Sequence, residues 1–306
     1  MYIIDCHSHF GNDYYKGNIT IDDYLHHISN MGVNLSLLMP VPSPKAENNE
    51  KILKVKYIKN KGFLYSPNVN PFINMNYKYY DKLIKYKNTS DKKLIYVPYI
   101  HPILDKVNKL EELIKYIHPA FFKINGVQSC VNPKNVPKEF INLLKKYNIA
   151  LIIHTQYQNQ YIDSFDGNRI IKKINHPYQW AKFLINNEIS GILNHGCGLD
   201  IDTLNLIKDY KNILVALGPD LALLKNNNRV SINLDKNNQL AYLYNLKKLI
   251  SYKKIVFDID YNWNIIENKD YLDDVERVKK VFSQFECEYI FNKNILSISK
   301  TLQKEL

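Results

Sequence analysis

The sequence predicts an α/β fold, a single (β/α)8 TIM barrel in regular or distorted form with long βα loops. Three observations predict it: short apolar runs recur along the 306 residues, amphipathic segments lie between them, and ionisable residues fall at the same ends of several runs. A hydrophobic content of 45% is enough for one large core and excludes a disordered or fibrous protein.

Eight apolar runs are rich in Ile, Val, Leu, Phe or Tyr and are too short for buried helices. Their nearly continuous hydrophobicity is typical of strands that are buried on both faces of a parallel sheet. The predicted strands are residues 2–5, 33–39, 93–100, 120–125, 149–155, 191–195, 212–217 and 254–259.

Amphipathic segments between these runs predict helices. Thr20, followed three residues later by Asp23, forms a capping box that opens a helix ending near Gly32. The other predicted helices carry apolar residues on one stripe and cover residues 136–147, 178–187, 203–210, 240–252 and 271–282.

The alternative α/β fold, an open doubly wound sheet, normally has a glycine-rich phosphate turn after its first strand. This chain has HSHFGNDYY there, and it shows no internal repeat, linker or composition break. We therefore expect one domain over residues 1–306. Long segments follow four strands, at residues 10–19, 40–49, 156–177 and 218–238, and a barrel places such segments on its catalytic face.

The net charge and the cysteine content indicate which binding partners and which cellular compartment to expect. The net charge is +11, but only three of the 41 cationic residues are arginine, which favours a solvated lysine surface over a nucleic-acid site. No apolar run is long enough to span a membrane, and the first residues lack the features of a signal peptide. Four widely spaced cysteines fit a reducing compartment. We expect a cytoplasmic protein with a small-molecule partner.

His7 and His9 end the first predicted strand, and residues two apart on an extended chain project to the same side. They form a natural chelating pair. Imidazoles with a carboxylate suit Zn(II), with Fe, Mn or Ni as alternatives. Six ionisable groups at the same strand ends would be costly if they were unpaired, so we predict a metal or catalytic site. The six are His7, His9, Lys123, His154, His195 and Asp260.

With these residues in place, the chain resembles the amidohydrolase superfamily, and within it amidohydrolase family 2, which includes the aminocarboxymuconate-semialdehyde decarboxylase-like enzymes. The resemblance covers essentially the whole chain in the right order. The matching pieces are IIDCHSHFG, FFKING, IALIIHT, GILNHGCG, IVFDIDYNW and FNKNILSISK.

The resemblance implies a divalent metal, most simply one Zn(II), held by His7, His9, His154 and Asp260. His195 is then either a ligand of a second metal or the residue that orients and deprotonates the metal-bound water. In binuclear relatives a carbamylated lysine at the position of Lys123 bridges two metals. In mononuclear relatives that lysine is an ammonium that contacts substrate. A homodimer is common among relatives.

The chain departs from the family pattern in its eighth strand, where Asp258 replaces the usual glycine. This extra carboxylate is either a partner of the ligands or a substrate contact, and we lean towards the first. Other polar residues beside the predicted site could orient ligands or substrate, and an aromatic residue could form a wall of the pocket. They are Asn125, Gln156, Asn194 and Trp263.

The sequence favours metal-dependent hydrolysis of a C–N bond (amide, cyclic amide or amidine-like) or of a lactone C–O bond. Asp260 would take the proton of the water, and His195 would stabilise the developing oxyanion. The alternative with the same metal site is nonoxidative decarboxylation. A TatD-like nuclease is less favoured because such enzymes have glutamate where this chain has Lys123, and a non-catalytic barrel scaffold is the remaining hypothesis.

Overall fold

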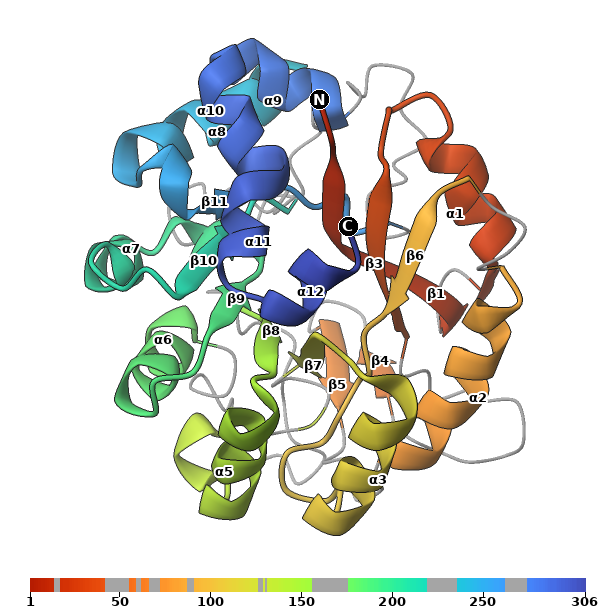
Figure 1. Cartoon of the computed structure of the whole chain (residues 1–306). Helices are drawn as coiled ribbons and strands as arrows, with labels where there is room; N and C mark the ends of the chain where they lie inside the picture. The colour runs from red at the N-terminus through yellow and green to blue at the C-terminus, as the bar shows by residue number, and fades with distance from the viewer. Residues whose placement is uncertain are drawn as a thin grey trace.

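The computed structural model describes residues 1–13, 17–41, 55–58, 62–65, 72–86, 91–125, 129, 131–155, 176–218, 236–261 and 274–306. In these ranges the chain is a mixed α/β structure, with strands at the centre and helices around them (Figure 1). Among the described helices none has both the length and the apolar character needed to cross a membrane.

All eight predicted strands are present, and those that pair in one sheet do so in parallel. The hydrogen-bonded order of these strands is β1-β3-β6 in one sheet and β11-β10-β9-β8-β7 in the other, and the short strand β2 (Gly17–Ile19) pairs with β1 on the side away from β3. The prediction of an α/β fold with parallel sheets is thus confirmed, with the ladders divided between two sheets. The eight strands are β1 (Ile4–Asp13), β3 (Leu35–Pro40), β6 (Lys93–Tyr96), β7 (Phe121–Asn125), β8 (Ala150–His154), β9 (Gly191–Leu193), β10 (Ile213–Ala216) and β11 (Ile255–Val256).

Backbone hydrogen bonds also join the two sheets where β11 meets β1. The N–H of Cys6 donates to the carbonyl of Phe257 at 3.0 Å, and the N–H of Asp260 donates to the carbonyl of His7 at 2.7 Å. The segment that carries Asp260 is therefore held directly against the strand that carries the two histidines.

A second junction lies between the chain after β6 and strand β7. The N–H of Lys123 donates to the carbonyl of Pro98 at 2.8 Å, and its own carbonyl accepts from Ile100 at 3.0 Å. Lys123 thus reaches the centre of the molecule from a backbone that is fixed on both sides.

The prediction of a loop at residues 10–19 is wrong in part, because β1 continues to Asp13 and pairs antiparallel with β2 (Gly17–Ile19). Gly11 explains why the strand can continue. Its φ is 111°, and a Cβ atom there would lie 2.6 Å from the ring of Tyr79, so only glycine fits. A further antiparallel hairpin, not predicted, is formed by β4 (Val55–Ile58) and β5 (Gly62–Tyr65).

The predicted helices are present. In α1 the N–H of Asp23 donates to the Thr20 hydroxyl at 3.0 Å, and the N–H of Thr20 donates to the Asp23 carboxylate at 3.1 Å, which confirms the capping box. Four of the described helices were not predicted: α2 (Ile73–Ile84), α3 (Val107–Ile117), α10 (Gln284–Glu288) and α12 (Lys300–Lys304). The others are α1 (Ile21–Ile28), α5 (Lys138–Tyr147), α6 (Pro177–Asn186), α7 (Ile201–Ile207), α8 (Lys236–Leu249), α9 (Asp274–Val281) and α11 (Asn294–Ser297).

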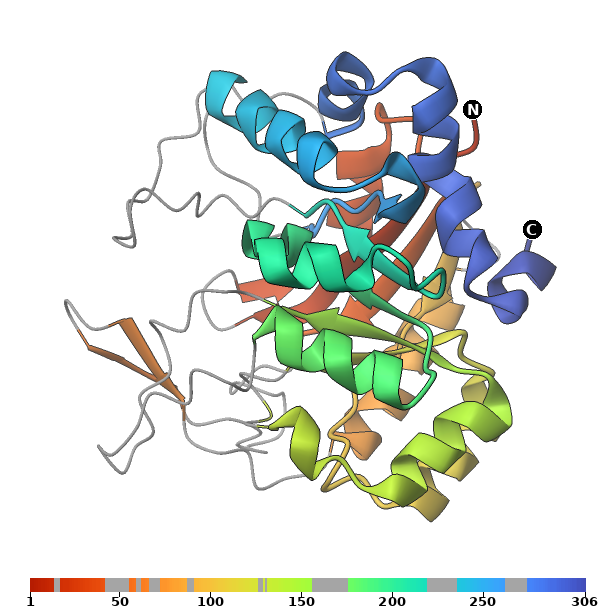
Figure 2. The same cartoon turned by 90° about the vertical axis from the view of Figure 1, so that its left-hand side faces the viewer.

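Buried apolar side chains form two clusters. The larger lies between strands and helices, and the smaller joins inward-facing residues of both sheets, such as Cys6, Phe121 and Ile152, to α11 and α12. In Figure 2 these two helices lie at the opposite side of the molecule from the β4–β5 hairpin, and β1 runs from the former side towards the latter. The carboxyl ends of the parallel strands therefore point away from α11 and α12.

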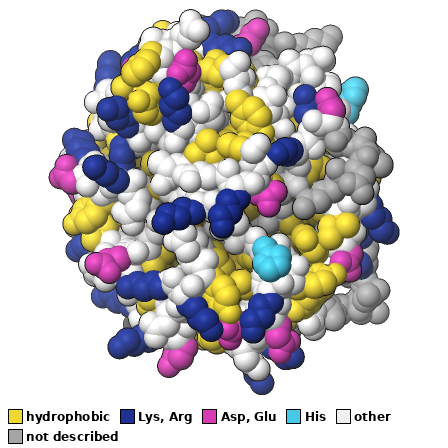
Figure 3. Space-filling view, viewed as in Figure 1, with side chains coloured by type: hydrophobic (Ala, Val, Ile, Leu, Met, Phe, Trp, Pro, Cys, Tyr) yellow, Lys and Arg dark blue, Asp and Glu magenta, His cyan; other side chains and the backbone are white. Residues whose placement is uncertain are grey.

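Charged residues are dispersed over the face seen in Figure 3, where lysines alternate with acidic and apolar side chains. Ion pairs such as Lys293–Glu288 at 2.6 Å and Lys247–Glu286 at 2.8 Å lie on the surface. On this face the positive charge forms no continuous patch among the described residues, as expected for a solvated lysine surface.

Candidate metal centre

The six ionisable residues singled out in the sequence all lie on central strands or directly after them. His7 and His9 are in β1, Lys123 is in β7, and His154 is the last residue of β8. His195 and Asp260 follow β9 and β11. Five of the six are buried, and His154 is half-buried. Parallel strands bring their carboxyl ends to one edge, so residues far apart in sequence meet there.

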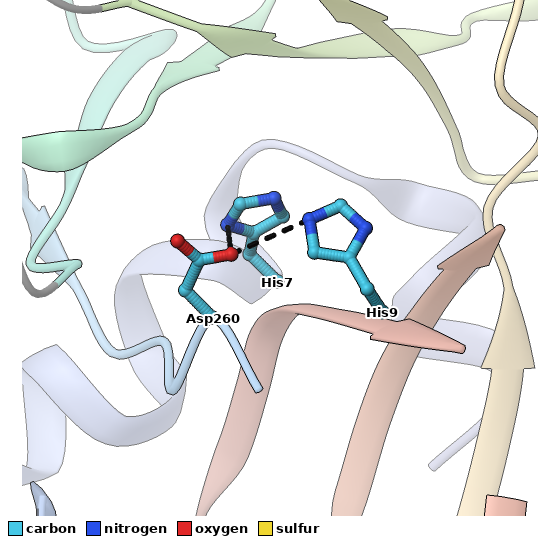
Figure 4. A group of neighbouring side chains, drawn as sticks. All are labelled: His7, His9 and Asp260. Atoms are coloured by element: carbon cyan, nitrogen blue, oxygen red, sulfur yellow. Dashed lines mark ion pairs between the residues drawn. The ribbon is translucent and has the colours of Figure 1, made fainter. Parts of the chain in front are cut away.

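His7, His9 and Asp260 form the centre of the site (Figure 4). One ligand atom from each lies within 4.8 Å of the other two. Asp260 Oδ1 is 3.3 Å from His9 Nε2 and 3.5 Å from His7 Nδ1. The two imidazole rings stand edge to face, with centroids 4.6 Å apart.

The donor set fits a zinc ion. Ligands of a tetrahedral zinc lie about 2.0–2.1 Å from the ion and therefore about 3.3 Å from each other, which matches the separation between His9 and Asp260. Asp260 Oδ1 and His9 Nδ1 are buried and have no hydrogen-bond partner within the described part of the chain. Buried polar atoms are rarely left in this state unless a ligand, water or ion completes them.

Asp5, which sequence reasoning missed, organises this part of the site. Its carboxylate accepts from the backbone N–H groups of His7 at 3.1 Å and Ile259 at 3.0 Å. It also accepts from the hydroxyls of Ser8 at 2.5 Å and Tyr24 at 2.7 Å. One buried carboxylate thus ties the histidine strand to the chain just before the third ligand. The available signal was an acidic residue inside a strand that is otherwise apolar.

Asp260 and His195 have left-handed backbone conformations, with φ of 51° and 59°. Non-glycine residues in this region are strained by about 1–3 kcal/mol and are concentrated at functional sites. Burial raises the pKa of Asp260, but the close contact with His9 and the positive charge that His195, His9 and Lys123 can carry outweigh it, so the pKa lies below the usual value. Asp260 is therefore a carboxylate.

His154 and His195 form a second pair, next to the first. His195 Nε2 lies 2.8 Å from His154 Nδ1, and His195 Nδ1 lies 3.8 Å from Asp260 Oδ2. Burial lowers the pKa of His195 to about 4, so this imidazole is neutral at pH 7. The structure places His154 against His195, outside the three-residue group, and its metal role stays a prediction.

Lys123 reaches the centre from the opposite side, with Nζ 2.8 Å from His7 Nε2. Burial lowers its pKa to about 7, although Asp260 and Asp258 act in the other direction. Burial also lowers the pKa of His7 well below its usual range, so His7 is neutral.

The weaker candidates divide into three groups. Asn194, at the end of β9, contacts the site directly, since its Nδ2 lies 2.8 Å from His7 Nδ1. Asn125 pairs with His154 across the β7–β8 ladder and lies beside the site. Gln156 and Trp263 lie outside the described residues.

Asp258 also borders His7, with Oδ2 3.5 Å from His7 Nδ1. Burial raises the pKa of its carboxyl well above the usual range, the bond from Gly218 and the charge of Lys123 lower it, and Asp260 and Asp5 raise it further. Its Oδ1 accepts a hydrogen bond from the backbone N–H of Gly218, the residue after β10. The carboxyl group is thus fixed at one oxygen and faces His7 with the other.

Solved structures with similar folds include a probable 2-pyrone-4,6-dicarboxylic acid hydrolase from Acinetobacter baumannii with citric acid bound, at a TM-score of 0.59 and 14% identity, covering 97% of this chain and 99% of that chain. A 5-carboxyvanillate decarboxylase from Sphingomonas paucimobilis has a TM-score of 0.60 at 9% identity, covering 98% and 99%. An amidohydrolase from Burkholderia multivorans with bound zinc has a TM-score of 0.61 at 9% identity, covering 97% and 99%. The chain has the amidohydrolase fold.

These similarities confirm the fold that the resemblance of the sequence had implied. These amidohydrolase-fold structures match over nearly their full length and nearly the full length of this chain. No protein-family model matches the chain, and neither does any curated protein. The named relatives include both a hydrolase and a decarboxylase, two reactions on one fold.

Proposed function

We propose that this protein is a metal-dependent hydrolase that cleaves a C–N bond (amide, cyclic amide or amidine-like) or a lactone bond of a small molecule. The observation that carries the proposal is the buried group of His7, His9 and Asp260, whose ligand atoms converge within 4.8 Å. Two imidazoles and a carboxylate form the donor set of catalytic zinc sites, which keep a further position open.

His7, His9 and Asp260 would hold the metal, with His154 as a further ligand and Zn(II) as the favoured ion. When bound, a divalent metal lowers the pKa of a coordinated water and polarises the bond to be cleaved. A single ion is favoured. Lys123 would join a second ion as a carbamate, a modification that needs the neutral amine, and the pKa of about 7 supports its formation.

Asp260 would transfer the proton of the attacking water, and His195 would stabilise the negative charge that develops on the substrate. Asp260 Oδ2 would take a proton from the attacking water and deliver it to the leaving group, since Oδ1 faces the two histidines. His195 is neutral, and its Nδ1 has no hydrogen-bond partner among the residues described, so it can stabilise a developing oxyanion.

We also propose that the eight parallel strands form one distorted (β/α)8 barrel and one domain. The support comes from the hydrogen bonds that link the sheets at both edges, at Cys6 and at Lys123. In such a barrel the metal centre lies at the catalytic face, where the carboxyl ends of the strands meet.

An unsaturated ring acid is the substrate class that the comparisons favour. The names of the similar structures refer to 2-pyrone-4,6-dicarboxylic acid, 5-carboxyvanillate and 2,6-dihydroxybenzoate. If Lys123 stays an ammonium, it would supply a cation for the carboxylate of such a substrate. Asn125 would supply a polar contact to the substrate. Gln156 and Trp263 remain predicted substrate contacts. A cytoplasmic homodimer without a nucleic-acid partner remains the expected form of the enzyme.

Nonoxidative decarboxylation is the second candidate, because two kinds of decarboxylase occur among the similar structures. The same metal ligands would bind a carboxylate or hydroxyl of the substrate, and a protonated side chain would deliver a proton to carbon. Both reactions use the same residues, so products distinguish them.

The test is product analysis by mass spectrometry after incubating zinc-loaded protein with lactones, cyclic amides and hydroxylated ring acids. We expect a ring-opened acid, an amine or ammonia. Release of CO2 with an otherwise intact ring would show that the reaction is decarboxylation and not hydrolysis. A lack of turnover across the panel with saturating metal would favour a non-catalytic scaffold.

Gly218→Ala will slow the reaction, because a Cβ there would lie 3.1 Å from His195 Cα and 3.2 Å from His195 Nδ1. The matched control is Gly32→Ala, which has the same strain from a positive φ but only Ile3 Cδ1 at 3.9 Å nearby. Both variants should unfold more easily, by about 1–2 kcal/mol. Only Gly218→Ala should lose turnover, by up to about 10²-fold for a shift of about 1 Å. Equal turnover in the two variants would contradict the placement of His195.

A further inference from the structure

His195 begins a turn whose backbone is left-handed throughout. The five consecutive residues 195–199 have φ values between 55° and 59°. Three of them, His195, Cys197 and Leu199, are not glycine, so their Cβ atoms make this conformation unfavourable. A strained conformation persists only where the surrounding structure holds it in place. The position of His195 therefore depends on contacts from outside the turn.

Tyr242, in helix α8, makes one of these contacts. Its side chain is buried, and its hydroxyl lies directly against Gly196, the residue that follows His195. A Cβ atom at Gly196 would overlap the hydroxyl oxygen and would lie 3.0 Å from Cζ of the tyrosine ring. The turn thus needs glycine at this position because the hydroxyl of Tyr242 occupies the space of a side chain.

The same hydroxyl also fixes the end of strand β10. It donates a hydrogen bond to the carbonyl of Leu217 at 3.0 Å, and the N–H of Leu217 donates to the carbonyl of Val256 at 3.0 Å. The next residue, Gly218, packs against His195, since a Cβ atom there would lie 3.1 Å from His195 Cα. Tyr242 therefore contacts the chain on two sides of His195.

We propose that Tyr242 is a positioning residue, whose hydroxyl holds His195 in place for the reaction. The proposal rests on the proposed role of His195, the stabilisation of the oxyanion. The hydroxyl acts on the backbone next to His195 and on the strand end that packs against it. These contacts set where His195 Nδ1 lies, which is 3.8 Å from Asp260 Oδ2. Displacement of such a group by about 1 Å costs up to about 10²-fold in rate.

Tyr242→Phe removes the hydroxyl and keeps the ring. On the substrate found in the product screen, kcat should fall by up to about 10²-fold while KM stays unchanged, because the oxyanion develops only in the transition state. Zinc content should also stay unchanged, since Tyr242 lies outside the group of His7, His9 and Asp260. An unchanged kcat in this variant would overturn the proposal.

Tyr96→Phe is the matched control. Tyr96 is also buried, and its hydroxyl donates to Asn76 Oδ1 at 2.9 Å. Each substitution removes one buried hydroxyl and its hydrogen bond, so both variants should have a lowered thermal unfolding midpoint. Only Tyr242→Phe should have a lowered kcat. Equal losses of kcat in the two variants would show that Tyr242 contributes stability alone, against the proposal.

Gly196→Ala tests the contact between Tyr242 and the turn. In the unaltered protein the new Cβ must displace the hydroxyl of Tyr242, whereas in the Tyr242→Phe protein that oxygen is absent. The alanine should therefore lower kcat by a smaller factor in the Tyr242→Phe protein than in the unaltered one. Equal factors in the two proteins would mean that the hydroxyl does not act through the turn, and the proposal would fail.

The position of His195 is also measurable without turnover. In protein labelled with 13C-histidine, His195→Gln identifies the ring resonances of His195 by NMR. These resonances should shift in Tyr242→Phe and stay in place in Tyr96→Phe, and the absence of a shift in Tyr242→Phe would contradict the proposal. If the unaltered protein turns over no substrate, the proposed function fails, while this measurement still decides whether Tyr242 positions His195.

Discussion

Asp260→Asn will reduce turnover by about 10²–10⁴-fold, the contribution of a positioned acid or base, while the protein stays folded. The amide removes the anionic oxygen that lies 3.3 Å from His9 Nε2 and the base that faces His195. Asparagine has the same size and tolerates the left-handed φ of 51°, so the backbone should keep its conformation. The measurement is kcat on the substrate found in the product screen, together with the thermal unfolding midpoint.

Asp202→Asn is the matched control for this change, because Asp202 is an exposed aspartate in the first turn of α7. It should keep full activity. If Asp260→Asn retained near-full activity, Asp260 would be neither the base nor an essential ligand. A variant that is inactive because it is unfolded would show a lowered unfolding midpoint, which separates the two causes.

Replacing His7 and His9 together by alanine will remove the bound metal. Protein purified without chelator should contain about one equivalent of zinc or another transition metal, and the double variant should contain none, as measured by mass spectrometry. The reason is geometric, since two of the three converging ligands are lost. Two equivalents in the unaltered protein would identify Lys123 as the bridging carbamate and favour hydrolysis.

The control for the metal measurement is a second double histidine variant, His26→Ala with His118→Ala, because both residues are exposed. This protein should keep its metal. If neither the unaltered protein nor the variants bind metal after reconstitution, the metalloenzyme assignment fails and a scaffold role remains.

Local patterns predicted most of the elements. Strands buried on both faces are recognisable because nearly every residue must be apolar, and all eight were found. Helix α3 was missed although Leu110, Leu113, Ile114 and Ile117 lie on one buried face with regular spacing. Helix α2 was harder to find, because it mixes Asn and Tyr among its buried residues and so lacks a clean apolar stripe.

The residue types of the site were also readable from the sequence. An ionisable side chain at the end of an apolar strand is costly to bury, so each one indicates a partner or a ligand. His7, His9 and Asp260 were predicted on this basis, and the structure brings their ligand atoms together. Lys123 lies within contact distance of His7, as the common strand ends implied.

The sequence by itself determined which ionisable residues lie at the ends of the strands, and on which strands they lie. Only the tertiary structure decided how they meet. Asp5 binds the N–H of Ile259 across 254 positions, and Asn194 reaches His7 across 187. Such contacts depend on how the two sheets pack and on the hydrogen bonds between β1 and β11. The local sequence pattern of a strand determines which side chains share a face. Long-range packing determines which residues from elsewhere in the chain contact that face.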